Sequence, residues 1–493
     1  MEKEVNQFDT ATGSEKLSTP KSVLFLLIGT AASIWVITHM GIGGAMILVT
    51  LPFTLVYFYF LFKNPITGLW ASIVTGFLLL GLGRYIDTDI QIGLGMDIIL
   101  VLTYVSYIFN NFYHKGIWKP AKKDVTLLAL IWFGYSILEF FNPEVQSRAA
   151  WFSGMRGISL YMVLVIPLVL IFIDSVKKLD FFFLLWGIFS LLASMKGIMQ
   201  ITLGPDPWEQ LWLATPSGQT HVIWGQLRAF SFLSDAGQFG ANQAYSGVMA
   251  VIVAFSESRR KRRLFFMLVA ALGFIGMFIS GTRGAISVPL AGFAFFFILR
   301  KNVWVMISGA VLLILVFVFF KFTYVGQDNT FVRRMRSAFD PNDPSLQVRI
   351  ENQKKLSAYL ATRPFGGGIG HAGVKAKAFL PNAFLSNIAT DSWFVLIWAE
   401  QGIVGLMLHL FILFYILIKG SFQIMFRIRD PVLRLKMSAL AAGMIGVMVA
   451  SYGNAVLGTM PTSLLIYTSM ALLMNSKIFE TEAASNERAT KNL

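Results

Sequence analysis

Long apolar stretches, separated by mostly short polar segments, recur along almost the whole chain. These stretches hold roughly 17 to 22 residues, the length that an α-helix needs to cross a bilayer core of ~30 Å. We therefore expect an all-α polytopic membrane protein with about 14 transmembrane helices. The fourteen predicted spans are residues 22–38, 43–62, 66–83, 95–113, 125–141, 157–173, 180–203, 238–256, 264–280, 284–299, 303–320, 392–418, 437–457 and 461–476.

The polar segments divide the chain into regions. We expect an N-terminal tail at 1–21, an N-terminal transmembrane bundle at 22–203, a region at 204–420 that carries the function, C-terminal transmembrane helices at 437–476 and a tail at 477–493. No small-residue cleavage site follows the first span, so it is interpreted as an uncleaved helix. The polar segments 204–237 and 322–391 are much longer than the others. Binding and catalytic residues are disproportionately found in such loops.

The second long segment is predicted to contain a helix of its own. An Asp-Pro-Asn-Asp-Pro turn at 340–344 precedes Ser345, a residue type that often caps helices. The helix is expected to run to Thr362 and to stop before the Arg363-Pro364 pair. A glycine-rich stretch at 366–370 then leads back toward the membrane.

Composition and charge narrow the class of protein. With 56% hydrophobic residues, 14% charged residues and a mean hydropathy of +0.65, a soluble globular domain is excluded. The absence of cysteine excludes disulfides, thiolate metal sites and cysteine nucleophiles. If the N-terminus lies inside, the short inside loops carry 19 Lys and Arg residues. The outside segments, apart from the longest loop, carry only five, namely Arg84, Arg148, Arg156, Arg228 and Arg283.

This asymmetry predicts that both termini are cytoplasmic, since short cytoplasmic loops are enriched in Lys and Arg. The net charge of +15 is therefore a topology signal and indicates no nucleic-acid partner. Arg283, in the hinge Ser280-Gly281-Thr282-Arg283-Gly284, stands against this bias at a membrane surface. We expect it to have an anionic partner. The alternative is a hairpin arginine that reaches a lipid headgroup.

Three motifs follow one another along the chain: the segment from Arg228 to Gly240, the hinge around Arg283, and a long outer loop that closes at Gly402-Ile403-Val404-Gly405. Together they resemble the O-antigen ligase and polymerase superfamily. Ligases of that family carry a His, then Asn, Ser or Gln, nine residues and Gly-x-x-Gly. Here Asp391 and Ser392 stand at the same spacing, so an aspartate replaces the histidine.

The resemblance implies an inverting, metal-independent glycosyltransferase in the bacterial inner membrane. Such an enzyme moves a glycan from undecaprenyl pyrophosphate to an acceptor hydroxyl on the periplasmic face and needs no cofactor. A ligase would use lipid A core or another surface carrier as acceptor, whereas a polymerase would use the growing lipid-linked glycan. A protein O-glycosyltransferase of the same superfamily is a further possibility. A lipid-linked glycan transporter or flippase is the alternative from another class, although transporters usually show repeats and broken helices at the midplane.

Chemistry suggests roles for three candidate catalytic residues. Arg228 and Arg283 can take up the charge that develops on a pyrophosphate leaving group, because guanidinium groups donate bidentate hydrogen bonds to phosphate. Asp391 can accept the proton of the acceptor hydroxyl. The competing interpretation of Asp391 is a helix N-cap, a role that Asp often plays.

Five further residues are candidate substrate ligands. Arg349 lies on the predicted loop helix, where it either binds substrate or pairs with a nearby acid. His371 and His221 are candidates to replace the missing family histidine. Lys196 and Glu400 fall inside predicted spans, where ionisable groups usually line a cavity or form ion pairs.

One tripeptide in the short outside loop after the third span has the form of a metal site. Asp87-Thr88-Asp89 has the Asp-x-Asp form that binds divalent ions in many sugar-nucleotide glycosyltransferases. Nucleotide sugars are not expected outside the inner membrane, so no metal ligand is predicted.

Overall fold

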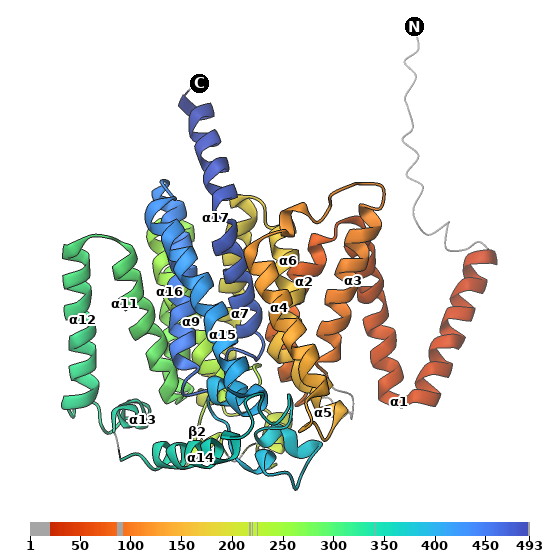
Figure 1. The fold of residues 1–493 in the computed structure, drawn as a ribbon. Helices are drawn as coiled ribbons and strands as arrows, with labels where there is room; N and C mark the ends of the chain where they lie inside the picture. Colours follow the sequence, from red (N-terminus) through yellow and green to blue (C-terminus); the bar gives the residue numbers. More distant parts are fainter. Residues whose placement is uncertain are drawn as a thin grey trace.

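The chain forms a bundle of helices that run side by side in alternating directions (Figure 1). The computed structural model describes residues 20–85, 92–215, 218, 220–223, 225–340 and 342–491. Seven helices within these residues are long and apolar enough to cross a membrane, and shorter apolar helices accompany them. The prediction of an all-α polytopic membrane protein is confirmed.

The helices coincide with all fourteen predicted spans. The first two spans form one long element, α1 (Pro20–Lys63), which bends sharply at Gly41 (φ 57°) into a V shape. The N-terminal half continues with α2 (Ile66–Leu82), α3 (Leu94–Asn110), α4 (Asp124–Leu138), α5 (Arg148–Met155), α6 (Tyr161–Phe172) and α7 (Val176–Thr202). The C-terminal half consists of α9 (Ala236–Ser256), α10 (Arg260–Ile279), α11 (Ser287–Leu299), α12 (Val303–Phe322), α15 (Trp393–Phe426), α16 (Pro431–Ala450) and α17 (Thr462–Lys491).

Burial differs widely among the helices. Helix α9 is buried along almost its whole length and packs against α7, α10, α11 and α16. Its polar side chains find partners inside the bundle, as when Gln243 Oε1 accepts hydrogen bonds from Ser190 Oγ and Ser194 Oγ at 2.8 and 2.9 Å. Helix α12 is the opposite case, because only Gly309 and Phe320 of its residues are buried. Its apolar surface is therefore suited to lipid.

The two ends of the bundle differ in character. One end, lower in Figure 1, carries α8 (Pro207–Leu213), α13 (Thr330–Arg336), α14 (Pro344–Leu360) and the two-residue strands β1 (Val222–Ile223) and β2 (Gln226–Leu227). We call it the loop end, and the other the basic end. Helix α17 projects beyond the basic end. The loop helix begins at Pro344, and Asp343 Oδ1 accepts a hydrogen bond from Leu346 N at 3.2 Å. The prediction that Ser345 caps this helix is therefore wrong.

Candidate functional site

The Ser280–Gly284 hinge joins α10 to α11 at the loop end, and its glycines make room for neighbouring side chains. Gly281 is buried and has a φ of 57°, a value that favours glycine. A Cβ on Gly281 would lie 3.0 Å from Arg334 Cδ and 3.5 Å from Arg228 Cγ. Two arginine side chains therefore lie against a position that only glycine leaves open.

Arg228 makes three hydrogen bonds, two of which hold it against the hinge. Its Nε donates to the Ser280 carbonyl at 3.0 Å, and its Nη2 donates to Thr282 Oγ1 at 3.0 Å. Its Nη1 donates to the Thr220 carbonyl at 2.8 Å. The backbone of β2 and the preceding loop thus bring Arg228 from residues 204–237 to the hinge.

Arg283 and Arg334 complete a group that we call the arginine cluster, with Arg228 as its third member. Arg334, on α13, donates from Nε to the Gly281 carbonyl. Arg283 forms an ion pair with Asp343 and donates to Ser337 Oγ at 3.3 Å. The side chain of Arg283 remains 21% exposed, so the group stays open to solvent.

The cluster holds more positive than negative charge. Burial, with Arg334 and Arg283 adding to it, lowers the pKa of Arg228 to about 10, and Asp235 opposes the shift. Burial and the charge of Arg283 likewise lower the pKa of Arg334 to about 10, while Asp343 opposes it. Arg228 and Arg334 therefore remain charged at neutral pH. An anion placed among them would relieve their mutual repulsion.

Asp391 lies just before α15 and forms an ion pair with Arg349 of α14. Arg349 Nε and Asp391 Oδ2 are 3.2 Å apart, and the Asp391 side chain is 51% exposed. Ser392, not Asp391, is the N-cap of α15, because Ser392 Oγ accepts a hydrogen bond from Val395 N at 3.4 Å. The capping interpretation of Asp391 is therefore wrong.

The Arg349–Asp391 pair approaches the hinge across the turn that follows α16. Trp393 N donates to the Ser451 carbonyl at 2.9 Å, which ties the start of α15 to this turn. A Cβ on Gly453 would lie 3.8 Å from Arg349 Nη1 and 4.0 Å from Gly284 Cα. The fold therefore brings together the predicted residues Arg228, Arg283, Arg349 and Asp391 around one patch of the loop end.

The Gly402-x-x-Gly405 motif is a break inside α15. Gly402 leaves the helical conformation, with φ 65° and ψ −168°, and a Cβ there would lie 2.0 Å from the Pro364 carbonyl oxygen. Carbonyls freed by the break are satisfied elsewhere, since Gly367 N donates to Ala399 O at 2.9 Å and Tyr135 Oη to Gln401 O at 3.0 Å. The motif thus joins the glycine-rich stretch of the loop to the membrane helix.

Glu400 and His371 lie in this junction and are engaged by backbone groups. The buried Glu400 accepts a hydrogen bond from Ala372 N at 3.2 Å. His371 Nε2 accepts from Gln146 N and Ser147 N at 3.0 and 3.1 Å, so Nδ1 carries the proton and donates to the Ile369 carbonyl at 2.8 Å. Both side chains therefore bind the loop to its surroundings, and their prediction as substrate ligands stays a prediction.

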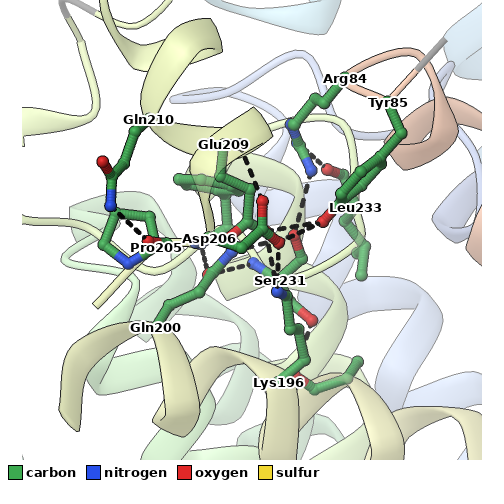
Figure 2. A network of polar contacts seen from close by, with 12 residues as sticks. Arg84, Tyr85, Lys196, Gln200, Pro205, Asp206, Glu209, Gln210, Ser231 and Leu233 are labelled. Atoms are coloured by element: carbon green, nitrogen blue, oxygen red, sulfur yellow. Dashed lines mark hydrogen bonds and ion pairs between the residues drawn. The ribbon is translucent and has the colours of Figure 1, made fainter. Parts of the chain in front are cut away.

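Lys196 belongs to a second polar group, which we call the paired network (Figure 2). Its Nζ lies 3.0 Å from Asp206 Oδ2 and 3.2 Å from Glu209 Oε1. Glu209, fully buried, also accepts a hydrogen bond from Gln200 Nε2 at 2.7 Å, and Arg84 Nη1 donates to the Ser231 carbonyl at 3.0 Å. Every cation of the network faces a carboxylate or a carbonyl, so Lys196 forms the ion pairs that were the alternative to substrate binding.

His221 is packed near this network and away from solvent. It is 4% exposed, stacks edge-on against Trp212 and Phe230, and accepts a hydrogen bond at Nε2 from Ala236 N at 3.2 Å. These contacts anchor the segment that leads to Arg228. The metal alternative, Asp87-Thr88-Asp89, lies outside the described residues.

Two residues at the site escaped the sequence analysis. Arg334 belongs to the run Arg333-Arg334-Met335-Arg336 in the longest loop, which was left out of the charge comparison. If that loop had been counted, these three arginines would have been recognised, like Arg283, as positive charges on the side where few are expected. No sequence pattern of this kind identifies Asn454, the second residue. Its buried Nδ2 makes no hydrogen bond within the described structure and faces Gly284, where a Cβ would lie 2.2 Å away.

Two comparisons with known proteins found similarity to this chain. Residues 266–410, which include Arg283, Arg334, Arg349 and Asp391, match the model of the O-antigen ligase family. An O-antigen polymerase of Salmonella muenchen is 27% identical over 187 residues, which make up 38% of this chain and 45% of that protein. The chain thus matches less than half of the relative's length. Both findings confirm the resemblance that the motifs indicated.

Proposed function

We propose that the chain is an inverting, metal-independent glycosyltransferase of the ligase type, because residues 266–410 match the O-antigen ligase family and an O-antigen polymerase is 27% identical over 187 residues. In this proposal a glycan moves from undecaprenyl pyrophosphate to an acceptor hydroxyl, such as one on lipid A core. The loop end faces the periplasm of the bacterial inner membrane, and both termini are cytoplasmic.

The arginine cluster is the observation that carries the proposal. Three guanidinium groups gather at the loop end, and Asp343 is the acid that pairs with one of them. As the anomeric C–O bond breaks, its electron pair moves onto the pyrophosphate oxygen. Arg228, Arg283 and Arg334 stabilise that charge, since fixed donors aimed at a developing anion lower the barrier.

The Arg349–Asp391 pair supplies the second half of the chemistry. The acceptor oxygen attacks the anomeric carbon from the face opposite the leaving group, which inverts the configuration. The Asp391 carboxylate takes the proton of that hydroxyl, and Arg349 at 3.2 Å fixes the orientation of the carboxylate. The exposure of Asp391 leaves room for an acceptor.

Purified protein tests the proposal directly. With undecaprenyl-pyrophosphate glycan, an acceptor and no ion gradient, a ligase or polymerase releases undecaprenyl pyrophosphate and forms a glycosidic bond. Translocation of the intact donor across a liposome without bond formation would instead establish the transporter alternative. A polymerase is the second candidate, because the Salmonella relative is named as one. In a deletion strain, loss of lipid A-linked polymer with accumulation of lipid-linked polymer supports the ligase, whereas single repeat units on core support the polymerase.

The orientation has its own test. A reporter that is active only in the periplasm should be active when it is fused near Asn342 in the longest loop. The same reporter should be inactive when it is fused after Arg429. The reverse result would place the arginine cluster in the cytoplasm and remove the donor from its reach.

A further inference from the structure

A cavity of about 1050 Å³ lies at the basic end of the bundle, far from the arginine cluster. It is bounded by the first residues of α4, the last turns of α15 and the part of α17 that projects from the bundle (Figure 1). These elements come from three distant parts of the chain. A ligand bound here would contact all three.

The cavity is lined by six cations and two acids: Lys122, Lys123, Lys419, Arg427, Arg429, Lys477, Asp124 and Glu480. Asp124 is occupied by an ion pair with Lys419. Glu480 accepts hydrogen bonds from the backbone N of Arg429 at 3.0 Å and of Asp430 at 3.4 Å. Within the described part of the chain, Lys122, Arg427 and Lys477 therefore have no acidic partner.

A second, mostly apolar cavity of about 560 Å³ adjoins the first. It shares Lys122, Lys123 and Asp124 with it and continues between Trp118, Leu127, Leu130 and Pro167. The Leu127 and Leu130 side chains are 59% and 53% exposed. Positive charge at the membrane boundary is thus continuous with an open apolar groove.

We propose that the two cavities together bind an anionic phospholipid, with its phosphate among Lys122, Arg427 and Lys477 and an acyl chain along Leu127 and Leu130. Basic pockets between membrane helices on the cytoplasmic side recognise such headgroups. A topology signal explains basic residues at this end, but it requires neither a cavity nor an adjoining apolar groove. The inference does not depend on the proposed transfer reaction.

Lipid retention by the purified full-length protein tests the charged half of the site. Native mass spectrometry would compare phosphatidylglycerol with phosphatidylcholine on the wild type and on the triple variant Lys122→Gln, Arg427→Gln, Lys477→Gln. At about 1 kcal/mol per basic residue, the triple variant should bind phosphatidylglycerol on the order of a hundredfold more weakly. The matched control, Arg259→Gln, Arg260→Gln, Lys261→Gln, removes three exposed cations from the same end and should keep its affinity. Equal losses in both variants would reduce the effect to diffuse charge and overturn the site.

The apolar half has an independent test that leaves every charge in place. Leu127→Trp and Leu130→Trp should fill the groove and weaken phosphatidylglycerol retention, whereas Leu138→Trp, also exposed on α4 but at the loop end, should not. Inorganic phosphate serves as the soluble probe. If millimolar phosphate displaces the lipid completely and the groove variants retain lipid like the wild type, the cavity is a free-anion site and the lipid proposal fails.

Discussion

The paired network and the arginine cluster lie at the same end of the bundle but balance their charges differently. In the network, Lys196 has two carboxylates within 3.2 Å. In the cluster, three guanidinium groups surround one hinge, and two of them have pKa values lowered to about 10 by burial and mutual repulsion. A buried charge that is fully paired is part of the fold. An excess of like charge in a partly buried group favours the binding of an anion.

The two regions are connected through the backbone. Glu209 accepts a hydrogen bond from Gln200 Nε2 at 2.7 Å, and Gln200 Oε1 accepts from Ser231 N at 2.7 Å. Ser231 has a φ of 54°, unusual for a residue with a side chain. The network therefore fixes the conformation of the segment that carries Arg228 and so supports the cluster.

The largest expected effect is on stability and comes from the network. Glu209→Ala removes the buried acceptor of Gln200 and one of the two carboxylates that face Lys196, which should lower the free energy of unfolding by ~3 to 5 kcal/mol. Thermal unfolding in detergent measures this loss. Gln210→Ala, one position along α8 but exposed, is the control and should change stability little. A Glu209→Ala protein that unfolds like the wild type would show that the network is not structural.

Asp391→Asn should lower the transfer rate by about 10²- to 10⁴-fold if Asp391 is the general base. Ser392 caps α15, so the substitution leaves the helix cap intact and stability should hold. Asp340→Asn, an exposed acid in the same loop, is the matched control. Asp391→His restores the ligase motif at the same spacing and should keep partial activity with an altered pH profile. Wild-type turnover by a correctly inserted Asp391→Asn protein would exclude this role.

Arg283→Lys should be nearly as damaging to activity as Arg283→Ala, because a point charge does not reproduce a planar fork on phosphate oxygens. Losing one such transition-state contact typically costs ~3 to 4 kcal/mol, or two to three orders of magnitude in rate. Arg148→Lys, an exposed arginine at the same end, should keep full activity. If both lysine variants are fully active, Arg283 is a generic surface charge and the contrast with the network disappears.

The smallest effect concerns pH. Burial lowers the pKa of His371, so the unfolded chain binds more protons than the folded one below the ordinary pKa of ~6.5. The stabilising contribution of neutral His371 is present above that pH and is lost as the pH falls through it. Unfolding temperatures measured between pH 7.5 and 5 should fall less for His371→Gln, whose amide oxygen can accept the same two backbone hydrogen bonds. A pH profile unchanged by the substitution would contradict this account.

The sequence by itself was sufficient for the architecture. The length and apolarity of each stretch predicted the helices, since crossing a bilayer imposes a fixed number of residues on any sequence. The distribution of Lys and Arg also identified Arg283, because this residue departs from the enrichment of positive charge in short cytoplasmic loops. That enrichment can be counted from the sequence alone. The spacing from Asp391 to Gly405 also pointed to the right segment, and the break at Gly402 shows why glycine is required there.

Only the tertiary structure decided which charges meet. Asp343 lies 60 residues from Arg283, and Arg349 lies 42 residues from Asp391, and no local periodicity encodes such partners. Ser392 and Asp391 were equally good caps by residue type, but backbone geometry at the start of α15 assigned the cap to Ser392. Lys196 and Arg283 likewise look alike as cations near predicted membrane spans. Packing placed Lys196 beside two acids and Arg283 beside one acid and two arginines. The energy of each charge depends on the neighbours that folding brings to it.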